Sequence, residues 1–400
     1  MNNRAAPGLA VLLAGLAALG PFCIDTYLPS FPEIGESLLA SPISVQQTLT
    51  AYMLPYAIMA LWHGAISDAL GRRRVILASL ALFGIASLAC AFVTGIEQLW
   101  LLRAAQGLVA GVGAVVGRAI VRDLFDGPQA QRLISHVAMT FAIAPAVAPI
   151  IGGWLHTWFG WRSVFVFLGV VAIILWLASS RWLDETLPVE KRQSLHPGYL
   201  MRTYWRVLTS PAFITSSLAI GFNFVGFFIY IMSAPVFMLR HLGVSEREFF
   251  WLFGPAMAGL VIGSWISGRL AGKASPHATI GQGYALMAGA ALTNLLVTQV
   301  LPPGLPWSVA PIFLYTVGMS LSMPSLTLAG LDLFPAQRGL ASSCQTFLQS
   351  LCSALVAGIV APLLWDTPAH LAYGMAGLLG LGGLCAWLHH QLTCNKLTSP

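Results

Sequence analysis

The sequence contains few charged residues. Only 8% of its 400 residues are Asp, Glu, Lys or Arg, whereas 57% are hydrophobic. A water-soluble domain usually has about 25% charged residues, because its surface must face water. The scarcity of charge therefore excludes an ordinary soluble globular protein and indicates that most of the surface faces lipid.

Several sequence patterns that indicate other functions are also absent. The six cysteines form no C-x-x-C pair and have no histidine at metal-ligand spacing, so no metal or other cofactor is expected. Gly272-Lys273 does not continue a phosphate-binding loop, because Ser267 stands at its first glycine and Ala274 at its hydroxyl residue. No Ser/His/Asp catalytic pattern is present, which argues against an enzyme. The basic residues are scattered, so nucleic acid is not an expected partner.

Hydrophobic runs instead recur along the whole chain. The first has no charged residue from Ala5 to Ile24, about the length that crosses a hydrocarbon core of roughly 30 Å. A signal peptide is the alternative, but this run is too long and more such runs follow. The runs predict twelve membrane spans, at residues 8–28, 45–66, 75–93, 98–120, 133–156, 161–182, 211–239, 249–270, 278–300, 306–331, 339–363 and 369–390.

The basic residues between these spans are unevenly distributed. With the N-terminus inside, fifteen of the twenty Lys and Arg residues fall in inner loops and three in outer loops, while Arg103 and Arg118 lie within spans. Short cytoplasmic loops carry an excess of Lys and Arg. The distribution predicts a multi-pass protein of the bacterial inner membrane with both termini in the cytoplasm.

The most polar stretch, Asp184 to Arg206, divides the spans into two sets of six. We predict an all-α membrane protein with twelve transmembrane helices in two six-helix bundles. Residues 1–183 form the first bundle, 184–210 a cytoplasmic linker and 211–400 the second bundle. Short repeats such as Ile66-Ser67 and Ile266-Ser267, after the second and eighth spans, favour a duplication. Two related halves around a shared site are one arrangement expected of transporters.

Asp25 is the clearest acidic residue within a span. It lies in Cys23-Ile24-Asp25-Thr26-Tyr27, near the outer half of the first span. A carboxylate at membrane depth costs on the order of 2.5–3.5 kcal/mol, so it should face a bundle interior or a watery cavity. Because burial disfavours the charged form, such a group can gain and release a proton near neutral pH. We predict a proton carrier; the alternatives are an outer-rim residue and a structural hydrogen-bonding partner.

Arg103, in the fourth span, is the corresponding basic candidate. A buried guanidinium stays charged and needs an acceptor, so Arg103 would stabilise charged Asp25 or a bound substrate. The alternative is an arginine that extends to the outer interface from about one turn inside. Arg118, near the inner end of the same span, is expected to extend to the interface.

The loop after the second span holds the most specific local pattern, Gly64-Ala65-Ile66-Ser67-Asp68-Ala69-Leu70-Gly71-Arg72-Arg73-Arg74. Gly64 allows close helix approach and Gly71 permits a tight turn. Asp68 can pair with a basic group or cap a helix. We predict a conformational latch built from Gly64, Asp68, Gly71 and Arg72. The alternative is a charged loop that only sets the topology.

The fifth span contains two prolines and two glycines, in Ala144-Pro145-Ala146-Val147-Ala148-Pro149-Ile150-Ile151-Gly152-Gly153. Prolines free backbone carbonyls and glycines allow close packing. We predict a bent helix at a moving interface, formed around Pro149, Gly152 and Gly153. Ordinary packing of membrane helices is the alternative. The small residues of the fourth span that could face this helix are Gly107, Gly111, Gly113 and Gly117.

Aromatic and amide side chains within the spans are candidates for a substrate cavity, because aromatic surface with sparse hydrogen bonds binds varied organic molecules. A lipid-facing position for the aromatics, and hydrogen bonding between helices for the amides, are the alternatives. The predicted cavity residues are Tyr27, Tyr52, Tyr56, Phe222, Asn223, Phe227, Tyr230 and Gln345.

Together these patterns resemble the major facilitator superfamily, specifically its twelve-span drug:proton antiporters of the bicyclomycin-resistance (Bcr/CflA) type. The resemblance covers the whole chain. Ala148 departs from the usual glycine before the proline, and Ala69 stands where arginine is frequent. Four motifs support the resemblance. Gly64 to Arg74 is similar to the family's loop between helices two and three, and Arg103-x-x-Gln106-Gly107 is similar to the proton-coupling motif of helix four. Pro149-x-x-Gly152-Gly153 is similar to the antiporter motif of helix five, and Ile24-Asp25-x-Tyr27-Leu28-Pro29-x-x-Pro32 is similar to the helix-one signature.

The resemblance implies proton-driven export of small organic compounds by alternating access, with Asp25 and Arg103 coupling proton and substrate. It also implies a monomer in the lipid bilayer that uses the proton gradient and no cofactor. Because Asp25 is the clear intramembrane acid, neutral or singly charged substrates are expected. The open alternative is an exporter or importer of a metabolite, such as an amino acid, sugar or nucleoside, on the same fold.

Overall fold

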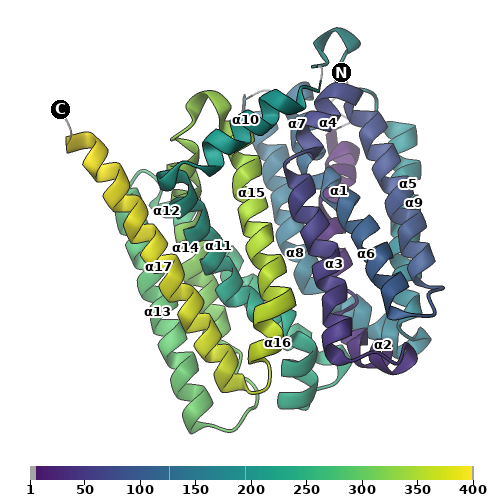
Figure 1. Ribbon diagram of the computed structural model, residues 1–400, viewed down its shortest axis with the longest axis vertical. Coiled ribbons are helices and arrows are strands. Elements are labelled where there is room, and N and C mark those ends of the chain that lie inside the picture. Colours follow the sequence, from purple (N-terminus) through teal and green to yellow (C-terminus); the bar gives the residue numbers. More distant parts are fainter. Residues whose placement is uncertain (1–5, 126, 194, 399–400) are drawn as a thin grey trace. The chain divides into compact units, whose positions relative to one another are not determined.

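A computed structural model describes residues 6–125, 127–193 and 195–398 of the chain. Within these ranges the chain is almost entirely helical and contains no strand. It divides into two compact units, Met1–His196 and Pro197–Pro400. Figure 1 shows long helices running side by side within each unit. The division falls inside the range 184–210, whose role as a linker stays a prediction.

The first unit is built around α1, which carries Asp25 at its last position. α1 packs against α7, α8 and α9, while α3 packs against α6, and α5 packs against α6 and α9. The helices of this unit are α1 (Ala6–Asp25), α2 (Phe31–Ser37), α3 (Pro42–Ala60), α4 (His63–Leu70), α5 (Arg72–Cys90), α6 (Ile96–Ala110), α7 (Val112–Leu124), α8 (Gly127–Phe159) and α9 (Arg162–Trp182), with 3₁₀ turns at Leu28–Ser30 and Val189–Lys191.

The second unit is built around α11, which packs against α14, α15 and α17. Its helices are α10 (Pro197–Leu208), α11 (Pro211–Met232), α12 (Phe250–Leu270), α13 (Pro276–Val300), α14 (Ala310–Leu331), α15 (Arg338–Leu355), α16 (Ala361–Leu364) and α17 (Pro368–Thr398), with 3₁₀ turns at Glu246–Glu248 and Pro335–Gln337. Segments of π-helix, Pro235–His241 and Val356–Val360, lie beside prolines, which lack the N–H that a regular helix needs.

Helical segments cover each of the twelve predicted spans, although several spans contain more than one segment. Within the described residues, ten helices are long and apolar enough to cross a membrane, and the pair α3 and α4, bent by 56°, makes an eleventh. α8 has 33 residues and covers the predicted span 133–156. The predicted all-α membrane fold is therefore confirmed.

The second predicted span is bent, because the helix breaks between Ala60 and His63. The fourth crosses as one span, Ile96–Leu124, with a one-residue interruption of the helix at Gly111. The breaks meet, because His63 Nε2 lies 2.9 Å from the carbonyl oxygen of Leu108 in the last turn of α6. Carbonyls at a helix end lack helical donors, so the buried imidazole can satisfy one of them.

Small residues allow the helices of the first unit to approach closely. A Cβ at Gly107 would overlap the backbone of Tyr52 on α3, and one at Gly113 would overlap the backbone of Leu16 on α1. Close approach of this kind stabilises membrane helix pairs through van der Waals contact. Facing the fifth span was one possibility for these glycines; Gly107 packs against α3 and Gly113 against α1 instead.

Candidate functional site

Arg103, on α6, is fully buried. Its Nη1 donates to Cys23 Sγ and to Gln106 Oε1, both at 2.8 Å. Gln106 in turn donates from Nε2 to Ser87 Oγ at 2.8 Å, so one polar chain joins α1, α5 and α6. Full burial rules out the alternative in which Arg103 extends to the interface, whereas Arg118 is exposed.

Two tyrosine rings enclose this guanidinium. Arg103 Cζ lies 4.5 Å from the ring centroids of both Tyr27 and Tyr52. The hydroxyl groups point elsewhere: Tyr52 donates to the Gly20 carbonyl at 3.1 Å, and Tyr27 pairs with Thr48. A desolvated cation–π contact contributes about 2 kcal/mol. The rings therefore stabilise the cation without neutralising it.

The charge of Arg103 has no counter-ion among the described residues. No carboxylate there lies within ion-pairing distance, and the Nε and Nη2 atoms have no hydrogen-bond partner. A buried charge at membrane depth is costly, and such residues mark ion or substrate pathways by default. Binding of an anionic group by Arg103 stays a prediction.

Asp25 ends α1 and is only 4% exposed. The helix stops here because Pro29, in the 3₁₀ turn Leu28–Ser30 that follows, has no N–H to donate to the Asp25 carbonyl. In the part of the chain that the structure describes, no hydrogen bond or ion pair reaches the Asp25 carboxylate. Arg103 therefore does not stabilise charged Asp25 in this conformation, and proton coupling by the two residues stays a prediction.

The predicted antiporter helix contacts the turn that follows Asp25. A Cβ at Gly152 of α8 would overlap the Thr26 carbonyl oxygen, so only glycine allows this approach. Pro149, Gly152 and Gly153 are all buried, and α8 continues as one helix through both prolines. Movement of α8 would therefore reach the backbone beside Asp25 directly. Its role as a moving interface stays a prediction.

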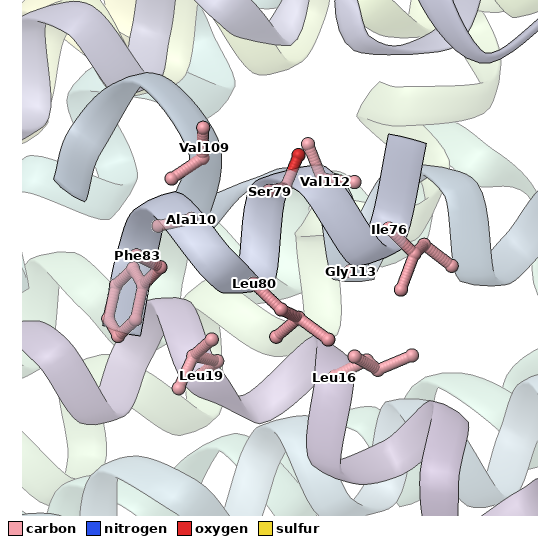
Figure 2. Close-up of a pocket in the computed structure, with 10 residues that line it drawn as sticks. All are labelled: Leu16, Leu19, Ile76, Ser79, Leu80, Phe83, Val109, Ala110, Val112 and Gly113. Carbon is pink, nitrogen blue, oxygen red and sulfur yellow. The ribbon is translucent and has the colours of Figure 1, made fainter. Parts of the chain in front are cut away.

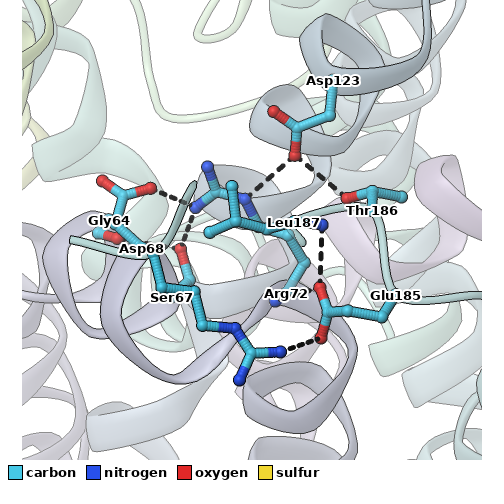
Figure 3. A network of polar contacts seen from close by, with 9 residues as sticks. Gly64, Ser67, Asp68, Arg72, Asp123, Glu185, Thr186 and Leu187 are labelled. Atoms are coloured by element: carbon cyan, nitrogen blue, oxygen red, sulfur yellow. Dashed lines mark hydrogen bonds and ion pairs between the residues drawn. The ribbon is translucent and has the colours of Figure 1, made fainter. Parts of the chain in front are cut away.

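The loop after the second span forms a dense polar network around Arg72 (Figure 3). The Arg72 side chain is 8% exposed and pairs with Asp68 at 2.5 Å and with Asp123 at 3.1 Å. Its Nη1 also donates to Ser67 Oγ at 2.6 Å, and Ser67 donates to the Gly64 carbonyl at 2.8 Å. The predicted latch residues are thus brought together, although latching itself stays a prediction.

Both Arg72 and Asp123 lie at helix ends whose dipole disfavours their charge, so each charge depends on the other for compensation. Arg72 begins α5, where the helix N-terminus disfavours a positive charge, and Asp123 lies in the last turn of α7, where the C-terminus disfavours a negative one. Each side chain compensates the other. Glu185 assists by accepting the Arg72 backbone N–H at 2.9 Å, which places a carboxylate at the N-terminus of α5.

The backbone geometry of this network requires glycine at position 71. Its φ of +98° is a left-handed conformation that side chains rarely adopt. A Cβ there would also overlap the Glu185 carboxylate, which Arg192 approaches at 3.7 Å. Arg73 fixes the same segment by donating to the Leu183 carbonyl at 2.8 Å. The chain after α9 is therefore held against the latch loop.

Sequence reasoning missed Asp123 and Glu185 as members of the latch. Asp123 follows Arg122 at the inner end of the fourth span, and Glu185 lies in the polar stretch that we assigned to the linker. Their negative charges at the predicted cytoplasmic side were a usable signal, because three consecutive arginines at 72–74 need acidic partners nearby. The separations of 51 and 113 residues hid the pairing.

Arg72→Gln is expected to lower the free energy of unfolding by about 1–2 kcal/mol. Breaking a fully buried ion pair costs about 3–5 kcal/mol, but Asp68 and Asp123 are 39% and 21% exposed, so water screens them. Arg74→Gln removes the same charge from an exposed neighbour and should change stability by at most about 0.5 kcal/mol. Thermal unfolding measures both. Equal effects of the two substitutions would contradict the network.

In the second unit, the predicted cavity residues take part in contacts between helices. Asn223 Nδ2 donates to the Tyr284 hydroxyl at 2.9 Å, joining α11 to α13. Tyr230, also on α11, accepts from Asn294 Nδ2 at 2.6 Å. Gln345 donates to the Thr327 carbonyl at 3.3 Å. These contacts fit the alternative of hydrogen bonding between helices.

Burial of the predicted cavity residues differs within the set. Five are almost fully buried, namely Tyr27, Tyr52, Asn223, Phe227 and Tyr230. Gln345 is 8% exposed, whereas Tyr56 and Phe222 are half-buried. The buried Asn223 Oδ1 has no hydrogen-bond partner among the described residues, so it can accept a further donor. A cavity-lining role for these residues stays a prediction.

A cavity in the first unit is too small for a transported compound (Figure 2). It measures about 10 Å³, roughly the room that one water molecule needs. Its walls are apolar apart from Ser79, and they include Leu16, Phe83 and Gly113. This space next to the break between α6 and α7 is a packing defect rather than a binding site.

The sequence is similar to known proteins over most of its length. The model of the Major Facilitator Superfamily matches residues 12–357. The chain belongs to the major facilitator superfamily. A relative in this superfamily, the uncharacterized MFS-type transporter YdgK of Bacillus subtilis (strain 168), is 35% identical over 88% of this chain and 88% of its own length.

Two further similarities extend over the whole chain. The bicyclomycin resistance protein homolog of Haemophilus influenzae is 26% identical over 100% of both chains. Among solved structures, a bacterial homolog of the human lysosomal transporter Spinster, in an inward-facing and occupied conformation, has a TM-score of 0.72 at 17% identity. It covers 98% of each chain, and at this identity it supports the major facilitator fold alone.

Proposed function

We propose that this major facilitator protein is a proton-coupled exporter of small organic compounds, including drugs, in the bacterial inner membrane. Asp25 carries the proton, and Arg103 couples its charge state to the substrate. Both termini lie in the cytoplasm, the protein acts as a monomer, and the proton gradient replaces any cofactor. The name of the Haemophilus influenzae relative supports a drug as substrate.

The observation that carries this proposal is the pair of buried ionisable groups in the first unit. Asp25 is 4% exposed and Arg103 is fully buried, and neither has an ion-pair partner in the described residues. An uncompensated charge at membrane depth lowers stability, so function is the simplest reason to retain it. The two groups also lie within one packed core, because Cys23, two residues before Asp25, accepts a hydrogen bond from Arg103.

The proposed cycle needs only proton transfer and movement of helices. A proton from outside binds the Asp25 carboxylate and neutralises it, which favours its burial and release of the substrate outside. In the inward-facing state, the proton leaves to the cytoplasm and the carboxylate becomes charged again. The Thr26 contact with α8 links this local change to the antiporter helix. One proton then moves inward for each turnover.

Accumulation of fluorescent drugs in cells tests this function. Expression should lower accumulation, because one proton moving through about 100 mV supplies about 2.3 kcal/mol, enough for a concentration ratio of roughly 50. An uncoupler should abolish the difference from cells without the protein. Metabolite export from loaded cells is measured in parallel. Uncoupler-insensitive accumulation, or export of metabolites alone, would contradict the proposal.

A further inference from the structure

Helix α10 is amphipathic and lies just before a membrane span. Its buried side packs against α11 and α15 through Leu200, Thr203, Tyr204 and Val207. None of these four residues carries a charge at physiological pH, and burial raises the pKa of Tyr204 further, to about 12. In Figure 1, α10 runs across the ends of α11 and α15 rather than alongside them.

The other side of α10 combines exposed apolar and basic residues. Trp205 is 71% exposed and Met201 is 57% exposed, and Arg202 and Arg206 are exposed as well. Residues four apart lie on the same face of a helix, so Met201 and Trp205 form one stripe and Arg202 and Arg206 form the next. The surface therefore places a large aromatic ring beside two positive charges.

The position of α10 along the chain brings this surface to the membrane. Only Thr209 and Ser210 separate α10 from α11, a span that begins at Pro211. Three Cα–Cα steps of about 3.8 Å cover at most about 11 Å. The C-terminal half of α10 therefore cannot move far from the bilayer surface, where tryptophan and arginine are favoured.

We propose that α10 binds the headgroups of anionic phospholipids in the cytoplasmic leaflet. Arg202 and Arg206 contact the lipid phosphates, and Trp205 and Met201 lie at the boundary between headgroups and acyl chains. Charge selects this partner: an anionic leaflet attracts basic residues near its surface, whereas a neutral one does not. The inference rests on the predicted cytoplasmic placement of this segment and is independent of the transported compound.

Quenching of Trp205 by brominated lipid tests the proposal on the full chain. The protein is placed in phosphatidylcholine nanodiscs with increasing fractions of phosphatidylglycerol brominated near the headgroup. The spectrum of Trp205→Phe is subtracted, so that the signal of one among 13 tryptophans is followed. Each arginine near an anionic surface contributes about fivefold in affinity. At the same fraction of phosphatidylglycerol, the ratio of docked to undocked α10 should therefore be roughly 25-fold lower in the Arg202→Gln/Arg206→Gln variant.

A matched control removes two exposed arginines elsewhere. Arg240→Gln/Arg247→Gln has the same change in charge and is predicted to lie at the opposite membrane face, so it should titrate like the unchanged protein. Thermal unfolding checks that all variants are folded. Quenching by brominated phosphatidylcholine to the same extent would overturn the selectivity for anionic lipid. Absence of quenching by either lipid would overturn the docking of α10 on the membrane.

Discussion

Arg103→Met is expected to abolish proton-driven transport while leaving the protein folded. The guanidinium is fully buried, and two of its nitrogen atoms lack hydrogen-bond partners among the described residues. An unpaired buried charge has a desolvation cost of several kcal/mol that no described ion pair offsets here, so an apolar side chain of similar length removes this cost together with the hydrogen bonds of the guanidinium. Methionine is flexible enough to fill the space between the Tyr27 and Tyr52 rings. The unfolding free energy should therefore change by no more than about 2 kcal/mol.

Transport should fall by about 100-fold or more in the same variant. The two hydrogen bonds from Nη1 to Cys23 and Gln106 hold the charge at a fixed point in the first unit. Without the charge, nothing in this core responds to an anionic group, and misplacement of a positioned group by about 1 Å already costs roughly 100-fold. Uptake into everted vesicles with an imposed pH gradient measures the loss.

Two comparisons make the Arg103 result specific. Arg118→Met removes the same charge from an exposed position on α7 and should retain most of the transport. Arg103→Lys keeps the positive charge but loses the planar guanidinium group and its several N–H donors. It should therefore restore little of the activity that Arg103→Met loses. If Arg103→Met is unfolded, the guanidinium is a structural residue. If it transports normally, Arg103 has no part in coupling.

Membrane spans could be predicted because each must cover about 30 Å with apolar residues. The breaks within the helices of the second and fourth spans could not be predicted. Gly111 marks a place where a helix can end, but whether it does depends on a donor from another helix, and that donor is His63, 45 residues away from Leu108. A single sequence shows which residues permit a break and not which neighbour satisfies the freed carbonyl.

In the candidate site too, contacts between residues close in sequence could be predicted, whereas contacts between distant helices could not. Asp68 and Arg72 are one helical turn apart, so their pairing follows from the spacing. For Arg103, we expected an acid or a substrate as acceptor. The structure instead provides the Cys23 thiol, the Gln106 amide and two tyrosine faces. The partners from α1 and α3 depend on helix packing, which composition and spacing do not specify.

Asp25→Asn is the second prediction with a large effect, because asparagine keeps the shape of the side chain but cannot carry a proton. Export driven by a pH gradient should fall by about 100-fold, to the level of passive leak. Exchange of a neutral substrate across the membrane without a gradient should persist, since it needs movement of the helices and no proton. Stability should stay equal or rise slightly, because Asp25 has no described partner to lose.

The measurement follows substrate-linked proton movement with a pH-sensitive dye inside vesicles. Asp332→Asn is the matched control, because Asp332 is 60% exposed and its pair with the exposed Arg338 at 2.7 Å contributes little. Loss of both exchange and gradient-driven export in Asp25→Asn would assign Asp25 to helix packing beside Gly152 and Thr26. Unchanged proton movement would remove it from the coupling scheme, and the carrier would then have to be another group in the first unit.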